Sequence, residues 1–295
     1  MRVLFIVGKG RSGSTLLDNA LGSIDGFFSG GEIHHLWDWG LEQGIPCGCG
    51  QPVTACPIWA PVLEKLGPAT KDAGAAQRAA LGWRALLAPR DAAAPYARLT
   101  LDLYRALADV TGAEVIVDAS KVPWHPAVRG LIPGLDVRVI HLVRDPRAVA
   151  FSWRRAKPMR AGGPGETMPV WGAARSAFSW LLRNLAAERA RRRHPPAHWM
   201  TLRYEDLVAA PAATMRRILA FAGRPDASLP TTDGITFELG VNHTVGGNPD
   251  RSDRTTVTVA ADDEWKTRQR SWDRWITTVV TAPLLRRYGY SLRAR

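Results

Sequence analysis

Residues 3–17 read VLFIVGKGRSGSTLL, and this stretch decides the fold. Its first five residues, Val3–Val7, are all apolar and predict a short buried strand. The spacing between Gly8 and Gly13 is typical of a loop whose backbone N–H groups wrap an anion. A helix predicted at Ser14–Leu21 then points its positive end at that anion. The stretch therefore predicts a strand, a phosphate-binding loop and a helix in succession.

The loop departs from the pattern of nucleoside triphosphatases at one position. A Walker-type loop has a lysine directly before its Ser or Thr, and that lysine contacts the terminal phosphates. Here Ser14 stands in the lysine position and Thr15 follows it. The loop thus keeps the anion cradle without the usual lysine. A tight glycine turn that binds no ligand is the alternative interpretation of these residues.

Strand and helix patterns alternate through the rest of the chain. Three more apolar runs predict buried strands, at Glu114–Asp118, Val137–Val143 and Trp199–Arg203. Helical patterns occur near Tyr96–Val110, Arg147–Arg154, Ala173–Arg193, Ala212–Ala222 and, with an interruption at Pro283, Asp263–Tyr290. This alternation predicts an α/β fold, a parallel sheet flanked by helices as in the P-loop kinases. Ligands of such sheets bind at the carboxyl ends of the strands. Two long loops are expected, at Lys157–Pro169 and Gly240–Thr256.

Length and charge narrow the class of protein. The chain has 295 residues and 46% hydrophobic content, which suits a single domain over residues 1–295. Its net charge of +12 favours an anionic partner. The one tight basic run, Arg191-Arg192-Arg193, is interpreted as a solvated helix end, and no zinc-finger or RNA-binding signature is present, so nucleic acid is not expected. No apolar run suits a membrane span or signal peptide, which predicts a soluble, cytoplasmic protein.

A second motif lies where another predicted strand ends. The run Val139–Arg147 finishes in Arg144-Asp145-Pro146, and Ser152 follows eight residues after Arg144 on the next predicted helix. Arginine offers a forked set of donors for phosphate, and a serine hydroxyl adds one more. The alternative is that Arg144 forms a strand-end ion pair with Asp145 or Asp118.

Together the two motifs resemble those of the PAPS-dependent sulfotransferases, where PAPS is 3′-phosphoadenosine-5′-phosphosulfate. The likeness extends to bacterial, tyrosylprotein and carbohydrate members and covers the chain from Met1 to about Tyr290. It implies a P-loop-kinase-like sulfotransferase fold. It also implies which residues bind PAPS: Arg11, Ser12, Gly13, Ser14 and Thr15 at the 5′-phosphosulfate, and Arg144 with Ser152 at the 3′-phosphate.

Other segments extend the resemblance. Val117–Lys121 is similar to an Asp-Ser-Ser-Lys segment of bacterial members, which implies that Lys121 and Arg11 stabilise charge as the sulfonate leaves. Asp118 is interpreted as structural. His243 and Gly246–Pro249, followed by Arg251, resemble a glycine-bearing loop near the nucleotide, so Arg251 is expected to bind PAPS. Trp265 fits packing on the adenine and packing in the core equally well.

The general base is expected in the run Gly30–His35. Tyrosylprotein and several bacterial sulfotransferases carry Gly-Glu at this point, which implies that Glu32 takes the acceptor's proton. His34 or His35 is the alternative, because the hormone-type cytosolic family uses a histidine. A third alternative is that none of these residues is the base.

Three cysteines lie close together in the sequence, at Cys47, Cys49 and Cys56. They could supply three ligands of a zinc site with His34 or His35 as the fourth, but the paired C-x2-C signature is absent. A disulfide and free thiols in a packed loop are the alternatives, and free thiols are preferred here. A cytoplasmic setting disfavours a stable disulfide.

The resemblance implies transfer of a sulfonate group from PAPS to a hydroxyl or amine, with no metal ion required. The acceptor, which the sequence does not identify, is expected to be a small molecule, a glycan or a lipid. A small-molecule kinase using ATP–Mg²⁺ is the main alternative, and Ser14 in the lysine position counts against it. A non-catalytic nucleic-acid-binding protein is suggested by charge alone.

Overall fold

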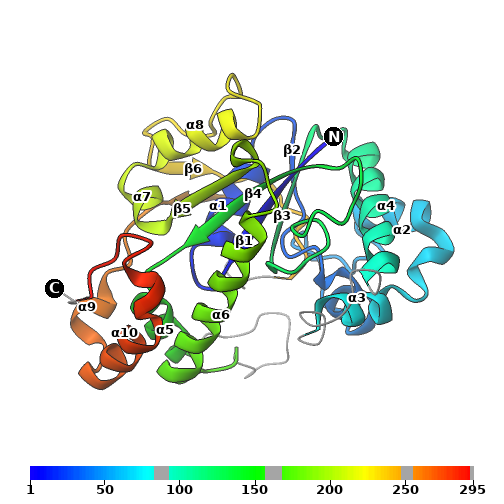
Figure 1. Cartoon of the computed structure of the whole chain (residues 1–295). Coiled ribbons are helices and arrows are strands. Elements are labelled where there is room, and N and C mark those ends of the chain that lie inside the picture. Colours follow the sequence, from blue (N-terminus) through cyan, green and yellow to red (C-terminus); the bar gives the residue numbers. More distant parts are fainter. Residues whose placement is uncertain (83–92, 157–167, 247–254, 293–295) are drawn as a thin grey trace.

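The sheet at the centre of the molecule is parallel, as the sequence predicts (Figure 1). The computed structural model describes residues 1–82, 93–156, 168–246 and 255–292. Five strands follow the order β2-β3-β1-β4-β5. Their bounds are Arg2–Gly8 for β1, Phe27–Ser29 for β2, Val115–Lys121 for β3, Asp136–Val143 for β4 and Trp199–Arg203 for β5. The predicted α/β class is therefore confirmed, and β3 continues past the predicted end at Asp118 to Lys121.

The central strand β1 divides its apolar side chains between the two faces of the sheet. Val3, Phe5 and Val7 join a core with α4 (Ala94–Thr111) and α2 (Trp59–Leu66). Leu4 and Ile6 join a second core with α1 (Ser14–Gly22) and α8 (Pro211–Phe221). An unbroken apolar run is what a strand buried on both faces requires.

A third core lies beyond the end of β4. It joins α5 (Pro146–Arg154), α6 (Ala173–Arg191) and α10 (Ser271–Leu285), with α9 (Glu264–Arg268) beside α5. The tail is interrupted at Gln269 and Arg270, which have extended backbones, so the predicted break at Pro283 is wrong. Pro283 lies inside α10, where its ring nitrogen cannot donate the usual hydrogen bond to the Val279 carbonyl.

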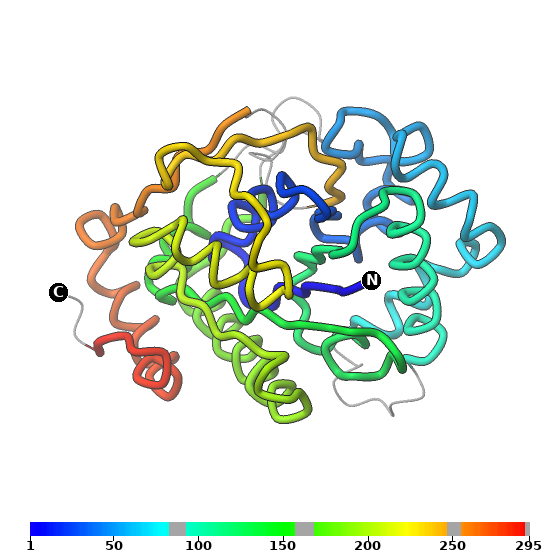
Figure 2. Tube along the Cα trace, turned by 90° about the horizontal axis from the view of Figure 1, so that it is seen from above, coloured from blue at the N-terminus to red at the C-terminus, as the bar shows by residue number. Residues whose placement is uncertain are grey.

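The remaining elements lie in three parts of the chain, residues 36–81, 196–209 and 236–258. They are η1 (Leu36–Glu42), η2 (Gly67–Thr70), α3 (Ala73–Leu81), η5 (Pro196–His198), α7 (Tyr204–Ala209), and the antiparallel pair β6 (Thr236–Glu238) and β7 (Thr256–Thr258). Figure 2 shows the light blue segment with α2 and α3 on the opposite side of the molecule from the orange and red α9 and α10. No helix among the described residues is long and apolar enough to span a bilayer.

The two expected long loops are only partly described, because residues 157–167 and 247–254 are outside the described ranges. The described part of the second loop has a defined partner. Val245 forms a parallel bridge with Gly31, and its N–H donates to the Gly30 carbonyl at 2.9 Å. This contact brings a segment near residue 245 beside the residues that follow β2.

Candidate active site

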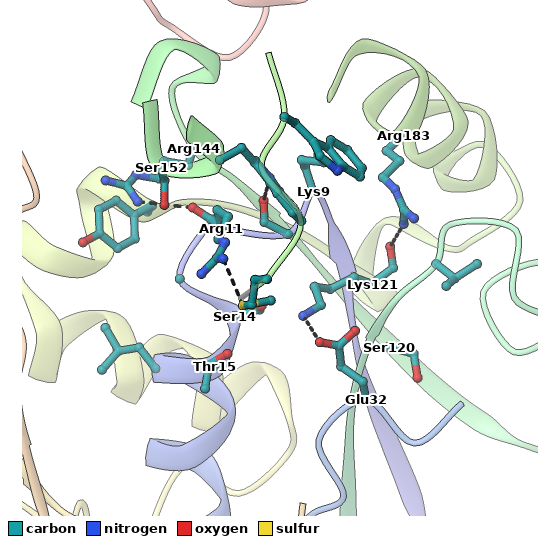
Figure 3. Close-up of a pocket in the computed structure, with 18 of the residues that line it drawn as sticks. Lys9, Arg11, Ser14, Thr15, Glu32, Ser120, Lys121, Arg144, Ser152 and Arg183 are labelled. Carbon is teal, nitrogen blue, oxygen red and sulfur yellow. Dashed lines mark hydrogen bonds and ion pairs between the residues drawn. The ribbon is translucent and has the colours of Figure 1, made fainter. Parts of the chain in front are cut away.

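A cleft of about 500 Å³ opens where β1, β3 and β4 end. Its lining includes residues of all three strand ends and of α5 and α6. Figure 3 shows Arg144 and Ser152 on one side of the cleft and Glu32 with Lys121 on the other, with the loop that carries Arg11 and Ser14 between them. The strand-end location is the one expected for a ligand site in a parallel sheet.

Two glycines allow the loop after β1 to make its turns. Gly8 has φ 146 and packs directly against the Leu142 carbonyl of β4. Gly13 has φ 90 and caps α1, and a side-chain carbon there would lie 2.6 Å from the ring of Tyr204. Both conformations are ones that glycine adopts freely and other residues rarely do. The loop therefore turns tightly enough to direct the first amides of α1 into the cleft.

The loop residues named from the sequence do not all reach the cleft. Arg11, Gly13, Ser14 and Thr15 line it. Ser12 does not, and its buried hydroxyl has no hydrogen-bond partner within the described residues. The structure therefore does not bring Ser12 into the cleft lining with the other four residues.

Arg11 and Lys121 share an uncommon backbone conformation. Their φ angles are 74° and 62°, and they alone among the described non-glycine residues have positive φ. A residue in this region costs on the order of 1 kcal/mol and is common at functional sites. Lys121 ends β3, where the pairing with β1 shifts register between Phe5 and Val7. The strain turns both side chains toward one cleft.

Arg144 is held in place from several directions. Its guanidinium lies 4.3 Å from the ring centroid of Tyr204, donates to the Arg11 carbonyl at 3.2 Å and pairs with Asp262 at 3.1 Å. Neither ion pair considered from the sequence forms, because Asp145 pairs with Arg147 at 2.6 Å. Asp118, the other candidate partner, accepts instead from Tyr104 and from the Ser120 backbone, at 2.6 and 2.8 Å. Ser152 lines the same cleft from α5.

Glu32 and Lys121 form an ion pair on one side of the cleft. The distance from Lys121 Nζ to Glu32 Oε1 is 2.6 Å, and both side chains are largely buried. The β3 strand supplies the lysine, while the bridge between Gly31 and Val245 fixes the backbone beside the glutamate. A carboxylate and an ammonium group are thus held together at one end of the cleft.

His35 lies between Glu32 of this ion pair and Asp38 of η1. Its Nδ1 lies 3.0 Å from Asp38 Oδ1, and its Nε2 lies 3.8 Å from Glu32 Oε2. The ring stacks on Trp39 at 3.8 Å, which fixes its orientation. His34 is buried, and burial lowers its pKa well below the usual value. His35 is therefore better placed than His34 to exchange a proton in the cleft.

Three basic residues of the cleft, Lys9, Arg155 and Arg183, were not identified as site residues from the sequence. Lys9 lies 4.0 Å from the ring centroid of Trp171, and burial, followed by the charge of Arg183, lowers its pKa to about 6. Arg183 of α6 donates to the Lys121 carbonyl at 3.1 Å. Lys9 could have been identified as a site residue from the sequence, because it belongs to the glycine-rich loop itself. Arg183 has no local signal, since α6 reaches the cleft only through tertiary packing.

The described lining is strongly positive. It holds six basic residues, Lys9, Arg11, Lys121, Arg144, Arg155 and Arg183, against two carboxylates, Glu32 and Asp262. A cleft lined by one sign of charge concentrates ligands of the opposite sign. The arrangement suits a ligand with anionic groups at more than one position.

Three residues named from the sequence remain. Arg251 lies outside the described residues. His243 is not beside the anion loop but next to Cys47 and Cys56. Trp265 is buried and lines a second cavity together with Arg144, Tyr204 and Asp262. This position is compatible with packing of Trp265 on an adenine and with packing of Trp265 in the core.

Comparisons with known proteins agree with this architecture. A model described as "Sulfotransferase family" matches residues 4–228. Carbohydrate sulfotransferase 2 of Homo sapiens is 32% identical over 31% of this chain and 23% of that protein. Carbohydrate sulfotransferase 5 of Homo sapiens is 35% identical over 31% of this chain and 25% of that protein. The chain thus matches about a quarter of the length of these curated relatives.

Solved structures show the same fold at low sequence identity. The sulfotransferase domain from the curacin biosynthetic pathway superposes with a TM-score of 0.56 and 19% identity, covering 99% of both chains. The sulfotransferase domain from the Synechococcus PCC 7002 olefin synthase gives 0.54 and 21%, covering 99% of this chain and 96% of that one. These similarities confirm the predicted sulfotransferase fold.

Proposed function

Because the chain belongs to the sulfotransferase family, we propose that it transfers a sulfonate group from PAPS to a hydroxyl or amine of an acceptor and releases 3′-phosphoadenosine-5′-phosphate (PAP). One observation carries the proposal. A single cleft has the glycine-rich loop in the middle, Arg144 and Ser152 on one side, and a carboxylate paired with a lysine on the other.

The residues present fit the nucleotide. The amides at the start of α1, the hydroxyls of Ser14 and Thr15 and the guanidinium of Arg11 suit the 5′-phosphosulfate. Arg144 and Ser152 suit the 3′-phosphate. Lys9 adds a further donor for the same anion. A small-molecule kinase is disfavoured because Ser14 replaces the lysine that such loops place on the terminal phosphates.

The acceptor end supplies proton transfer and charge stabilisation. Glu32 takes the proton of the acceptor hydroxyl while the acceptor oxygen forms its bond to sulfur. The bond from sulfur to the bridging oxygen breaks, and PAP carries away the electron pair. Lys121, Arg11 and the loop amides stabilise the charge that develops on the departing oxygen. His35, oriented by Asp38, is the alternative base.

The acceptor is proposed only by class. The curated relatives bear the name carbohydrate sulfotransferase, so glycans are the first acceptors to test. Small molecules and lipids follow.

A thermal-shift comparison tests the donor site. PAP without added magnesium should stabilise the protein by about 2.7 kcal/mol at 100 times its Kd, more than ATP–Mg²⁺ or duplex DNA at the same concentration. A melting temperature that PAP leaves unchanged, while ATP–Mg²⁺ raises it, would favour the kinase. Radiolabelled PAPS with glycan, lipid and phenol pools then identifies the acceptor.

A further inference from the structure

The three cysteines of the chain meet one histidine from a distant segment. Ligand atoms of Cys47, Cys49, Cys56 and His243 all lie within 4.8 Å of one another. The Cys56–Cys47 and Cys49–Cys56 sulfur distances are 3.6 and 3.8 Å. His243 Nδ1 lies 3.3 Å from Cys56 Sγ and 4.0 Å from Cys47 Sγ. The histidine is 187 residues from Cys56, so only folding brings it to the cluster.

These distances match a tetrahedral centre. Zinc bonds of about 2.3 Å to sulfur and about 2.0 Å to nitrogen separate the ligand atoms of a tetrahedron by roughly 3.5–3.8 Å. The observed separations lie on both sides of that range. A disulfide would join two of the sulfurs and leave the third thiol and the imidazole without a role. The shared arrangement of all four groups favours a metal ion.

We propose that Cys47, Cys49, Cys56 and His243 bind a structural zinc ion. Three thiolates and an imidazole are the ligands that zinc prefers over magnesium or calcium. His34 and His35, the fourth ligands considered from the sequence, belong to a different cluster with Glu32. That cluster already holds a cation, because the Lys121 ammonium lies 2.6 Å from Glu32. The fourth ligand is therefore His243.

Hydrogen bonds to backbone carbonyls hold the segments that carry the proposed ligand residues in place. The Gly50 N–H donates to the Cys47 carbonyl at 2.8 Å, so the first two ligands lie on one tight turn. The Trp59 indole donates to the His243 carbonyl at 2.6 Å, and the Gly48 N–H donates to the Thr244 carbonyl at 3.0 Å. With four protein ligands no open position remains for a substrate, which is typical of structural rather than catalytic zinc.

The site would fix the backbone that carries Glu32. Two residues beyond His243, the Val245 carbonyl accepts from the Glu32 N–H at 2.8 Å. Gly246 packs against the side chains of Glu32 and His35. Zinc thus cross-links the cysteine loop to the segment that holds the proposed base. This consequence for the base rests on the proposed function, whereas metal binding itself does not.

Metal content tests the site directly. Protein purified without chelator should contain about one zinc per chain by mass spectrometry of the metal, and Cys56→Ser and His243→Ala should each reduce it to near zero. His35→Ala is the matched control and should keep the zinc. Zinc retained by the cysteine variants but lost with His35→Ala would move the site to Glu32, His34 and His35 and overturn the proposal.

A second measurement uses the wild-type chain, in case the variants do not fold. Metal-free protein titrated with Co²⁺ should develop thiolate-to-cobalt charge transfer and tetrahedral bands that saturate at about one equivalent. Hydrogen exchange at Gly30–Leu36 should be faster in the metal-free form, with exchange at Gly8–Leu17 unchanged. The inference would be contradicted if the protein had three titratable thiols, no bound metal and no cobalt spectrum. A disulfide found by mass spectrometry would contradict it as well.

Discussion

The two ends of the cleft are built in different ways. At the donor end, Arg11–Thr15 belong to the loop that begins directly after β1 and to the start of α1, and Arg144 directly follows β4. At the acceptor end, Glu32 is fixed by Val245, paired with Lys121 and linked through that same segment to the cysteine loop. One end is composed of short motifs at strand ends, and the other of segments far apart in the chain.

This difference explains what each end can do. Parallel pairing of β1 with β3 and β4 sets the positions of the strand ends within the sheet, so the residues proposed to bind phosphate rest on its rigid core. The acceptor end depends on loop-to-loop contacts. We therefore expect substitutions at the donor end to change nucleotide affinity, and substitutions at the acceptor end to change turnover.

The largest expected effect is at the acceptor end. Glu32→Gln should lower turnover by about 10²–10⁴-fold, the usual contribution of a general base, and leave PAP affinity nearly unchanged. The amide keeps the size of the side chain and can still accept from Lys121, so the cleft should keep its shape. Steady-state kinetics with PAPS and calorimetry with PAP measure the two quantities separately.

The histidines give the competing forecast. If Glu32→Gln turned over normally while His35→Ala was inactive, the base would be His35, held by Asp38 at 3.0 Å. His34→Ala serves as the matched control, because the His34 ring is buried beside His35. Full activity of all three variants would remove the protein base from the mechanism.

The same contrast accounts for what the sequence could predict. The four longer strands and the anion loop were predictable because each is encoded in one contiguous stretch. The three-residue strand β2 was missed, since Phe27–Ser29 is too short to show a period. The proximity of His243 to Cys56 could not be predicted either, because no local pattern encodes a contact across 187 residues. Lys9 was predictable in principle, but its low pKa depends on tertiary burial.

At the donor end the main effect should be on affinity. Arg144→Ala should weaken PAP binding by about 10- to 150-fold, because a charge-assisted hydrogen bond contributes roughly 1.5–3 kcal/mol. Turnover at saturating PAPS should change much less. Arg191→Ala is the matched control, since Arg191 is an exposed cation at the end of α6 and does not line the cleft. Equal losses in both variants would show that only net charge matters.

A smaller effect concerns pH. Burial, followed by the charges of Arg183 and Lys121, lowers the pKa of Lys9 to about 6, so its amine is mostly neutral at pH 7. A bound phosphate would raise this pKa, so PAP binding should take up a proton. Between the pKa of Lys9 in the free protein and its higher pKa in the complex, Lys9 is protonated in the complex and neutral in the free protein. PAP affinity should therefore fall as pH rises above about 6, by at most about tenfold per unit.

Lys9→Arg provides the control for this pH dependence. Arginine stays charged across the range, so the variant should lose the part of the slope that belongs to Lys9 and keep the part that belongs to PAP. Calorimetry in buffers of different ionisation enthalpy counts the protons taken up by each protein. An identical slope in the wild type and the variant would assign the pH dependence to another group.

The smallest expected effect distinguishes two roles for Asp262. Its carboxylate pairs with Arg144 at 3.1 Å and also lies 3.4 Å from Arg155, so it lies beside the proposed 3′-phosphate site. If the carboxylate competes with the phosphate for Arg144, Asp262→Asn should tighten PAP binding by about 1.4- to 5-fold, the range for a partly exposed ion pair. Adenosine 5′-monophosphate, which lacks the 3′-phosphate, should show no such gain. Weaker PAP binding in the variant would mean instead that Asp262 orients Arg144, and the donor end would then depend on a distant segment just as the acceptor end does.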